Sequence, residues 1–207
     1  MQKIDFKKEL KQLYKPGRDF GLVEVPAMSF LQVDGHGDPN TSQDYTDAVE
    51  ALYGIAYKIK FSSKKELGRD YVVPPLEGLW WAQDMESFSS QRDKSAWDWT
   101  MMIMQPDWIS PTAFQAARDE LAGKKKHPAL PKIRMETYEE GLCVQFLHIG
   151  SYDDEGPMIA RMHQEWMPAN GFRENGKHHE IYLSDPRRVP PEKLRTIIRQ
   201  PIKKAAR

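Results

Sequence analysis

The chain has 207 residues, a mass of 24.0 kDa, and 30 basic side chains balanced by 30 acidic ones. This balance excludes a whole-molecule field that would attract nucleic acid or an anionic membrane. No segment approaches the ~18 uninterrupted apolar residues of a membrane span. The single cysteine, Cys143, cannot form an internal disulfide, and the N-terminal residues lack a signal-peptide core, so we expect a cytoplasmic protein.

The first part of the chain contains several segments with the hydrophobic patterns of helices and strands. In chain order they are a short helix to about Tyr14, a strand at 28–35, a helix at 41–60, strands at 70–83 and 96–105 with a polar loop around 87–95 between them, and a helix from Ser110 to about Gly123. The helix at 41–60 is the clearest, because one apolar stripe follows a Thr41 or Ser42 cap.

The order of elements then repeats after a linker at 124–132. The second part is predicted to contain a strand at 141–156, a helix at 157–167 that begins with Pro157, and strand-like runs at 178–185 and 193–202. The segments FLQVDGHGDP, from Phe30, and FLHIGSYDDE, from Phe146, also align without a gap. Each half therefore has the order strand, helix, strand, strand, which favours an internal duplication.

The duplication predicts an α+β fold in a single domain. We expect two β-α-β-β halves related by a pseudo-two-fold axis, with an antiparallel sheet, helices on one face and a ligand cleft between the halves. The predicted boundaries are an N-terminal extension at 1–22, a first half at 23–110, a helix and linker at 111–132, and a second half at 133–207.

The run KHHEIYLSD raises the question of a carboxylate inside a strand. Because side chains alternate along a strand, His178, Glu180 and Tyr182 share one face, opposite Ile181 and Leu183. That face is either exposed to solvent or part of a cavity. Aligning the third element of each half sets Glu77 beside Glu180 and predicts that the two glutamates face each other across the axis.

The element order, the HHEIYLSDP run and the Pro-rich turn before the last strand resemble the GyrI-like small-molecule-binding domains. The resemblance extends from about Val23 to Ile202. The further runs VDGHGDPNTSQDY, PLEGLWW and YLSDPRRVPPEKLRTIIRQP are similar to a stand-alone bacterial subgroup in which some members hydrolyse cyclopropane-bearing genotoxins. The resemblance implies a pocket between the halves, with Glu180 directed inward beside Tyr182.

Two functions use the same predicted carboxylate. In a hydrolase, Glu180 would act as the base that activates water, and Tyr182 would donate a hydrogen bond to the developing oxygen anion. In a binder, Glu180 would pair with the positive charge of a lipophilic aromatic drug and sequester it. The other predicted ligand-contacting residues are Glu77, Leu79, Trp81, Trp99, Met101 and His178. Core packing and a solvent-facing strand remain the structural alternatives.

The sequence predicts no metal and no cofactor. His178 and His179 are adjacent on a strand and point apart, and neither HExxH nor CxxC occurs. The basic segment 187–207 carries regularly placed apolar residues, which suits a closing strand better than nucleic-acid binding. No helix-turn-helix pattern is present, and nothing indicates a surface for DNA gyrase. The expected partner is a small aromatic or amphipathic molecule.

Overall fold

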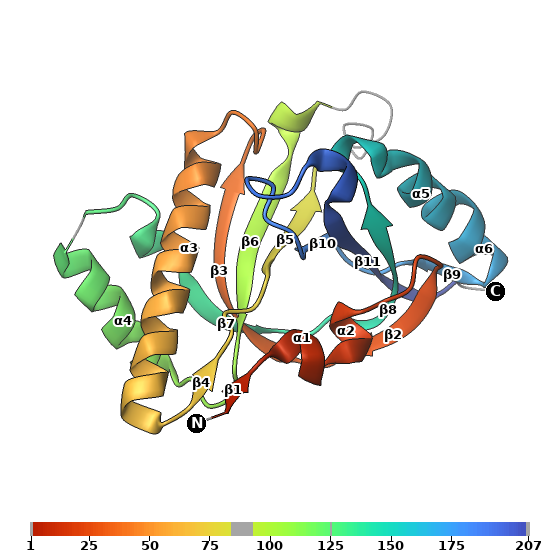
Figure 1. Cartoon of the computed structure of the whole chain (residues 1–207). Helices are drawn as coiled ribbons and strands as arrows, with labels where there is room; N and C mark the ends of the chain where they lie inside the picture. The colour runs from red at the N-terminus through yellow and green to blue at the C-terminus, as the bar shows by residue number, and fades with distance from the viewer. Residues whose placement is uncertain (1, 84–92, 125, 206–207) are drawn as a thin grey trace.

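The computed structural model describes residues 2–83, 93–124 and 126–205, and most of the predicted polar loop at 87–95 lies outside them (Figure 1). The strands are β1 (Lys3–Ile4), β2 (Gly21–Val25), β3 (Met28–His36), β4 (Asp70–Tyr71), β5 (Leu76–Trp81), β6 (Asp98–Gln105), β7 (Arg134–Tyr138), β8 (Gly141–Ile149), β9 (Phe172–Glu174), β10 (His178–Tyr182) and β11 (Arg195–Lys204). The helices are α1 (Phe6–Glu9), α2 (Lys11–Tyr14), α3 (Gln43–Ser62), α4 (Pro111–Lys124), α5 (Gly156–Arg161) and α6 (Met167–Ala169), and a π-helical turn, Met162–Trp166, joins α5 to α6.

One large antiparallel sheet contains the strands of both predicted halves. Its order is β2-β8-β11-β10-β5-β6-β3-β7, and β9 pairs with the end of β11. The order is symmetric about the β10–β5 junction, where the third elements of the two halves meet, and β11 and β6 flank this central pair. The α+β fold with an antiparallel sheet is therefore confirmed.

The two outermost long strands, which the sequence did not predict, are exchanged between the halves. Strand β2 precedes β3 in the chain but pairs with β8, and β7 precedes β8 but pairs with β3. Residues 139 and 140 then connect β7, at one edge of the sheet, to β8 near the other edge. The sheet must curl back on itself to allow so short a connection.

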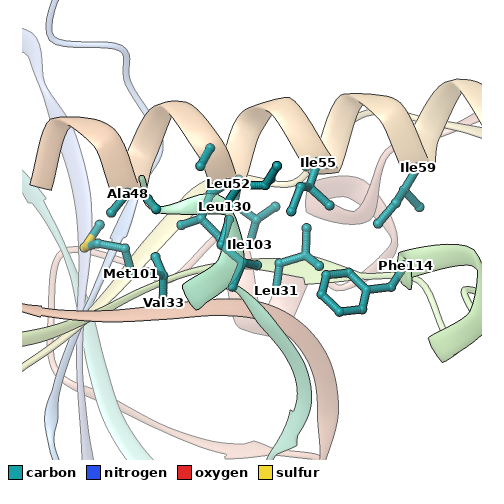
Figure 2. Packing of buried hydrophobic residues seen from close by; sticks show 14 of the residues in the cluster. Leu31, Val33, Ala48, Leu52, Ile55, Ile59, Met101, Ile103, Phe114 and Leu130 are labelled. Atoms are coloured by element: carbon teal, nitrogen blue, oxygen red, sulfur yellow. The ribbon is translucent and has the colours of Figure 1, made fainter. Parts of the chain in front are cut away.

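Helix α3 covers one half of the sheet. The side-chain oxygen of Ser42 accepts a hydrogen bond from the Tyr45 backbone N–H, so Ser42 is the N-cap, one of the two predicted candidates. The apolar stripe of α3 packs on the inward residues of β3 and β6, with α4 beside it (Figure 2). The residues of this contact include Ala48, Leu52, Ile55 and Ile59 from the helix and Leu31, Val33, Met101 and Ile103 from the strands.

The α5–α6 segment covers the other half on the same face, where Met162 and Met167 pack on Phe146 and Ile198. Figure 1 shows α3 to the left and α5 to the right of the central strands β5 and β10. The short helices α1 and α2 lie on the other face of the sheet, since Leu13 packs with Ile181 and Ile197. The central strands β5 and β10 are therefore flanked by helices from both halves on one face and covered by the N-terminal segment on the other.

Candidate functional site

Glu180 lies at the centre of the sheet, on the face that α3 and α5 flank. Strand register sets it opposite Gly78 on β5 and Ile198 on β11. Gly78 has no side chain, and the space that a Cβ would occupy is taken by the Trp80 indole nitrogen at 2.8 Å, the Met101 sulfur at 3.1 Å and the Tyr182 hydroxyl at 3.2 Å. The glycine therefore allows these three side chains to close in beside Glu180.

A directed chain of hydrogen bonds leads to this carboxylate. The Trp80 Nε1–H donates to Tyr182 Oη over 3.0 Å, and the Tyr182 hydroxyl donates to Glu180 Oε2 over 2.7 Å. His178 Nε2 lies 3.3 Å from Glu180 Oε1. Only 17% of the Glu180 side chain is exposed, so it is not on a solvent-facing strand surface. A phenol has one O–H group, and Tyr182 uses it to donate a hydrogen bond to Glu180 while its oxygen accepts one from Trp80.

Aromatic rings from both halves surround the Glu180–Tyr182 pair. Tyr152, just before α5, meets Tyr182 edge-on with centroids 5.7 Å apart. Tyr45 of α3 stacks on Trp80 at 6.2 Å, and Trp97 meets Trp80 edge-on at 5.8 Å. We call the rings of Tyr45, Trp80, Trp97 and Tyr152 the aromatic wall. Ring pairs of this kind can hold a flat apolar molecule.

These phenols remain protonated at neutral pH. Burial and then the Glu180 charge raise the pKa of Tyr152 to about 12, and the same two causes raise the pKa of Tyr45 and of Tyr182 above the usual range. A neutral phenol next to a carboxylate is a hydrogen-bond donor. Tyr45 and Tyr152 are therefore additional donors near the carboxylate.

Glu77 does not face Glu180, and that expectation is corrected. The strand register pairs Glu77 with Ile181 and Gly78 with Glu180. This register differs by one residue from the alignment of the two halves that sets Glu77 beside Glu180. A shift of one residue moves a side chain to the other face of a sheet. Glu77 is fully buried on the opposite face, where it accepts a hydrogen bond from the Tyr14 hydroxyl.

Leu79 and Trp81 share that opposite face with Glu77, so they are also separated from Glu180. Leu79 is buried in a cluster with Phe30 and Met102. The Lys177 ammonium group lies over the Trp81 ring, 3.2 Å from its centroid. A wall formed by Trp81 beside Glu180 is therefore excluded by the alternation of β5.

Trp99 and Met101 do lie on the Glu180 face, but both are fully buried under α3. The Trp99 indole donates to the Gly37 carbonyl over 3.3 Å and meets Tyr45 edge-on at 5.3 Å. These two residues pack under the aromatic wall on the same face of the sheet. Of the predicted ligand-contacting residues, the structure brings His178 directly to Glu180, together with the predicted catalytic partner Tyr182.

The sequence reasoning missed Tyr45, Trp80, Trp97 and Tyr152. Trp80 is adjacent to the predicted Trp81, and a one-residue change of register would have selected it. Tyr45 extends the apolar stripe of its helix, so a core position explains its place in the sequence as well as a site position does. Tyr152 lies in a short 3-10 turn, Tyr152–Asp154, and no periodic pattern marks it.

A second group of charged residues lies directly behind the site. His179 Nε2 is 3.0 Å from Glu77 Oε2, and its Nδ1 is 2.9 Å from Glu140 Oε1. The Arg199 guanidinium donates to Glu140 Oε2 over 3.1 Å. All four side chains are nearly or fully buried. We call this group, together with Tyr14, the buried charge network.

The buried charge network favours ionised forms in spite of its burial. Burial alone would lower the pKa of His179, but the charges and hydrogen bonds of Glu140 and Glu77 raise it to about 9. Burial likewise opposes ionisation of Glu140, yet His179 and Arg199 lower its pKa below the usual value. The ionised forms of His179 and Glu140 therefore stabilise each other behind β10 at neutral pH.

Among the described residues, no group of three or more His, Cys, Asp or Glu side chains is arranged to hold a metal ion. In the same part of the chain, no helix has both the length and the apolar character needed to cross a membrane. The predictions of no cofactor, no nucleic acid and no gyrase partner stay predictions.

The chain is similar to proteins of known structure along nearly its whole length. An uncharacterized conserved protein from Listeria innocua is 42% identical, with a TM-score of 0.89 over 97% of this chain and 100% of that one. A hydrolase from the same organism is 44% identical, with a TM-score of 0.85 over 98% of this chain and 100% of that one. The EcmrR C-terminal domain, 14% identical with a TM-score of 0.55 over 90% of this chain and 98% of that one, shares the fold alone.

Curated protein sequences gave no match. The model of the GyrI-like small molecule binding domain matches residues 19–203, which include both halves of the sheet and Glu180. The match also extends slightly beyond the segment Val23 to Ile202 that carried the resemblance. This chain therefore belongs to the GyrI-like small molecule binding domain family.

Proposed function

We propose that this protein hydrolyses small planar electrophiles that carry a cyclopropane ring, with Glu180 as the general base. The observation that carries the proposal is the half-buried Glu180 carboxylate among aromatic rings from both halves. The Listeria innocua relative that is 44% identical is described as a hydrolase, which supports hydrolysis as the reaction class.

The proposed reaction adds one water molecule across the strained ring. Glu180 removes a proton from water while the water oxygen bonds to the ring methylene carbon. The carbon–carbon bond of the ring breaks, and its electron pair moves through the conjugated system to a carbonyl oxygen, which gains a proton. Glu180 then releases its proton to solvent. General-base help of about 10²–10⁴-fold is sufficient when ring strain already lowers the barrier.

A phenol near the carboxylate would stabilise the developing oxygen anion. Tyr182, predicted for this role from the sequence, is a candidate if a ligand displaces its hydrogen bond to Glu180. Tyr45 and Tyr152 are the other candidates, because both phenols are protonated and the Glu180 charge contributes to the raised pKa of each. A cytoplasmic location is proposed with this function, since a detoxifying hydrolase would meet its substrate before the substrate reaches DNA.

The test follows product formation beyond one equivalent. The protein, in sub-stoichiometric amount, is incubated with a cyclopropane-bearing DNA alkylator, and the ring-opened product is quantified. Many turnovers by the wild type, lost in Glu180→Gln but kept in Glu165→Gln, are expected, because Glu165 is an exposed carboxylate on the π-helical turn. Saturation at one equivalent would refute catalysis and favour sequestration of cationic lipophilic aromatic drugs by the same aromatic wall.

A further inference from the structure

The N-terminal segment, residues 2–18, lies on the face of the sheet opposite Glu180 and precedes the region that the family model matches. Three carbonyl groups of this segment accept hydrogen bonds from the sheet. The donors are Gln145 Nε2 to Gln12 O at 2.7 Å, Arg199 Nη2 to Leu13 O at 2.7 Å and Leu147 N to Gly17 O at 2.8 Å. The segment is thus bonded to β8 and β11.

Tyr14 joins this segment to the buried charge network. Its hydroxyl donates to Glu77 Oε1 over 2.9 Å, while the other oxygen of Glu77 pairs with His179. Glu77 is on β5, His179 on β10 and Arg199 on β11, so the network links three neighbouring strands across the β10–β5 junction. These links run through charged groups with no access to solvent, where a carboxylate without its donor is costly.

The same three strands carry the site on their other face. Glu180 follows His179 directly in the chain, and its neighbour on β5 is Gly78, which offers no side chain to hold it. The lateral position of Glu180 therefore depends on where His179 is held, in addition to the hydrogen bond from Tyr182. A shift of β10 against β5 would move Glu180 relative to the aromatic wall.

We propose that Tyr14, through the buried charge network, is a positioning residue for Glu180, and that the N-terminal segment is thereby part of the functional site. This inference rests on the proposed role of Glu180. Tyr14 reaches Glu180 only through Glu77 and His179, so its effect must depend on Glu180 being present.

The experiment combines one hydroxyl removal with a double-mutant cycle. Tyr14→Phe keeps the ring and removes the donor to Glu77. Tyr71→Phe is the matched control, because Tyr71 is also fully buried beside the N-terminal segment, yet its hydroxyl has no hydrogen-bond partner among the described residues. Ring opening of the cyclopropane-bearing alkylator is measured at a temperature where denaturant melts show every variant fully folded.

We expect Tyr14→Phe to lower kcat about tenfold, with KM changed much less, because a small misplacement of a catalytic group reduces the rate of the bound complex. Tyr71→Phe should leave kcat unchanged. In the Glu180→Gln background, where the residual single-turnover rate of ring opening is measured with protein in excess, Tyr14→Phe should cause no further loss of rate, since the two changes act through one group. An unchanged kcat in folded Tyr14→Phe, or an equal loss in both backgrounds, would overturn the inference.

The two proposals fail in different ways. If the wild type shows no turnover, the hydrolase proposal is wrong, and the same cycle is run on the affinity for rhodamine 6G, a planar aromatic cation. Non-additive losses of affinity for Tyr14→Phe and Glu180→Gln would then support the positioning role, and additive losses would refute it. If Glu180→Gln changes neither turnover nor affinity, both proposals are wrong.

Discussion

The two faces of strand β10 use charged residues in opposite ways. On one face, His179 is fully buried and has a charged partner on each ring nitrogen, so its charge is neutralised by the protein. On the other face, Glu180 is partly exposed among aromatic rings, and its hydrogen-bond partners within the described residues are a phenol and an imidazole. Adjacent residues of one strand thus form a buried ion pair on one face and, in the proposed function, a reactive carboxylate on the other.

The largest effect on stability is expected from removing the charged side chain of His179 from the buried face of β10. His179→Leu would leave Glu77 and Glu140 as buried carboxylates without their shared partner, at a cost of roughly 3–5 kcal/mol in the free energy of unfolding. Urea denaturation measures this loss. Glu180→Gln, one residue away, should change the same quantity by less than about 1 kcal/mol, since its side chain is partly solvated. Equal losses would contradict the division between the faces.

The next effect is a dependence of stability on pH. The folded-state pKa of His179, about 9, lies above its ordinary 6.5, so its stabilisation is complete below about pH 6.5 and is lost as the pH rises through 9. The groups that face it are Glu77, Glu140 and Arg199, with Tyr14 donating to Glu77.

The resulting fall in the free energy of unfolding between pH 6.5 and 9 is roughly 3 kcal/mol. Urea melts across this range measure it, and His179→Gln should give a flatter curve because the titrating group is gone. A wild-type curve that stays level over the same range would contradict a charged His179 in the folded protein.

A smaller effect is expected from crowding the face that carries Glu180. A Cβ in Gly78→Ala would lie 2.8 Å from the Trp80 indole nitrogen and 3.2 Å from the Tyr182 hydroxyl. We expect a loss of about 1–3 kcal/mol in stability, with weaker ligand binding, because the rings must move apart. Gly21→Ala on β2 is the control, since nothing lies within 4 Å of its Cβ position. Equal melting midpoints for the two variants would refute this packing.

The smallest effect is expected from the exposed ion pair between the halves. Lys94 Nζ lies 3.3 Å from Asp153 Oδ1, and the aspartate side chain is 73% exposed. Lys94→Gln should therefore change the free energy of unfolding by less than about 1 kcal/mol, in contrast to the buried pairs of His179. A loss comparable to that of His179→Leu would show that exposure does not separate the two kinds of pair.

Local patterns in the sequence were sufficient for much of the fold. The α3 stripe, its Ser42 cap and the order of elements in each half follow from residues close together in the chain. The exchange of β2 and β7 between the halves could not be predicted in this way, because strand pairing joins residues more than 100 positions apart.

The site was predicted only in part, for the same physical reason. Alternation along β10 correctly put His178, Glu180 and Tyr182 on one face. The partner strand β5 required a register, and a one-residue error selected Glu77 and Trp81 in place of Gly78 and Trp80. Glu140 lies in the connection between β7 and β8, 39 positions from His179, and no local pattern indicates that the two side chains meet.

In the proposed function, the Glu180 carboxylate does chemistry on the aromatic face of β10. The most direct test is the single-turnover rate of ring opening with protein in excess over the cyclopropane-bearing alkylator, compared between the wild type and folded Glu180→Gln. We expect the rate constant to fall about 10²-fold or more, because a general base is lost. An unchanged rate constant in Glu180→Gln would contradict it.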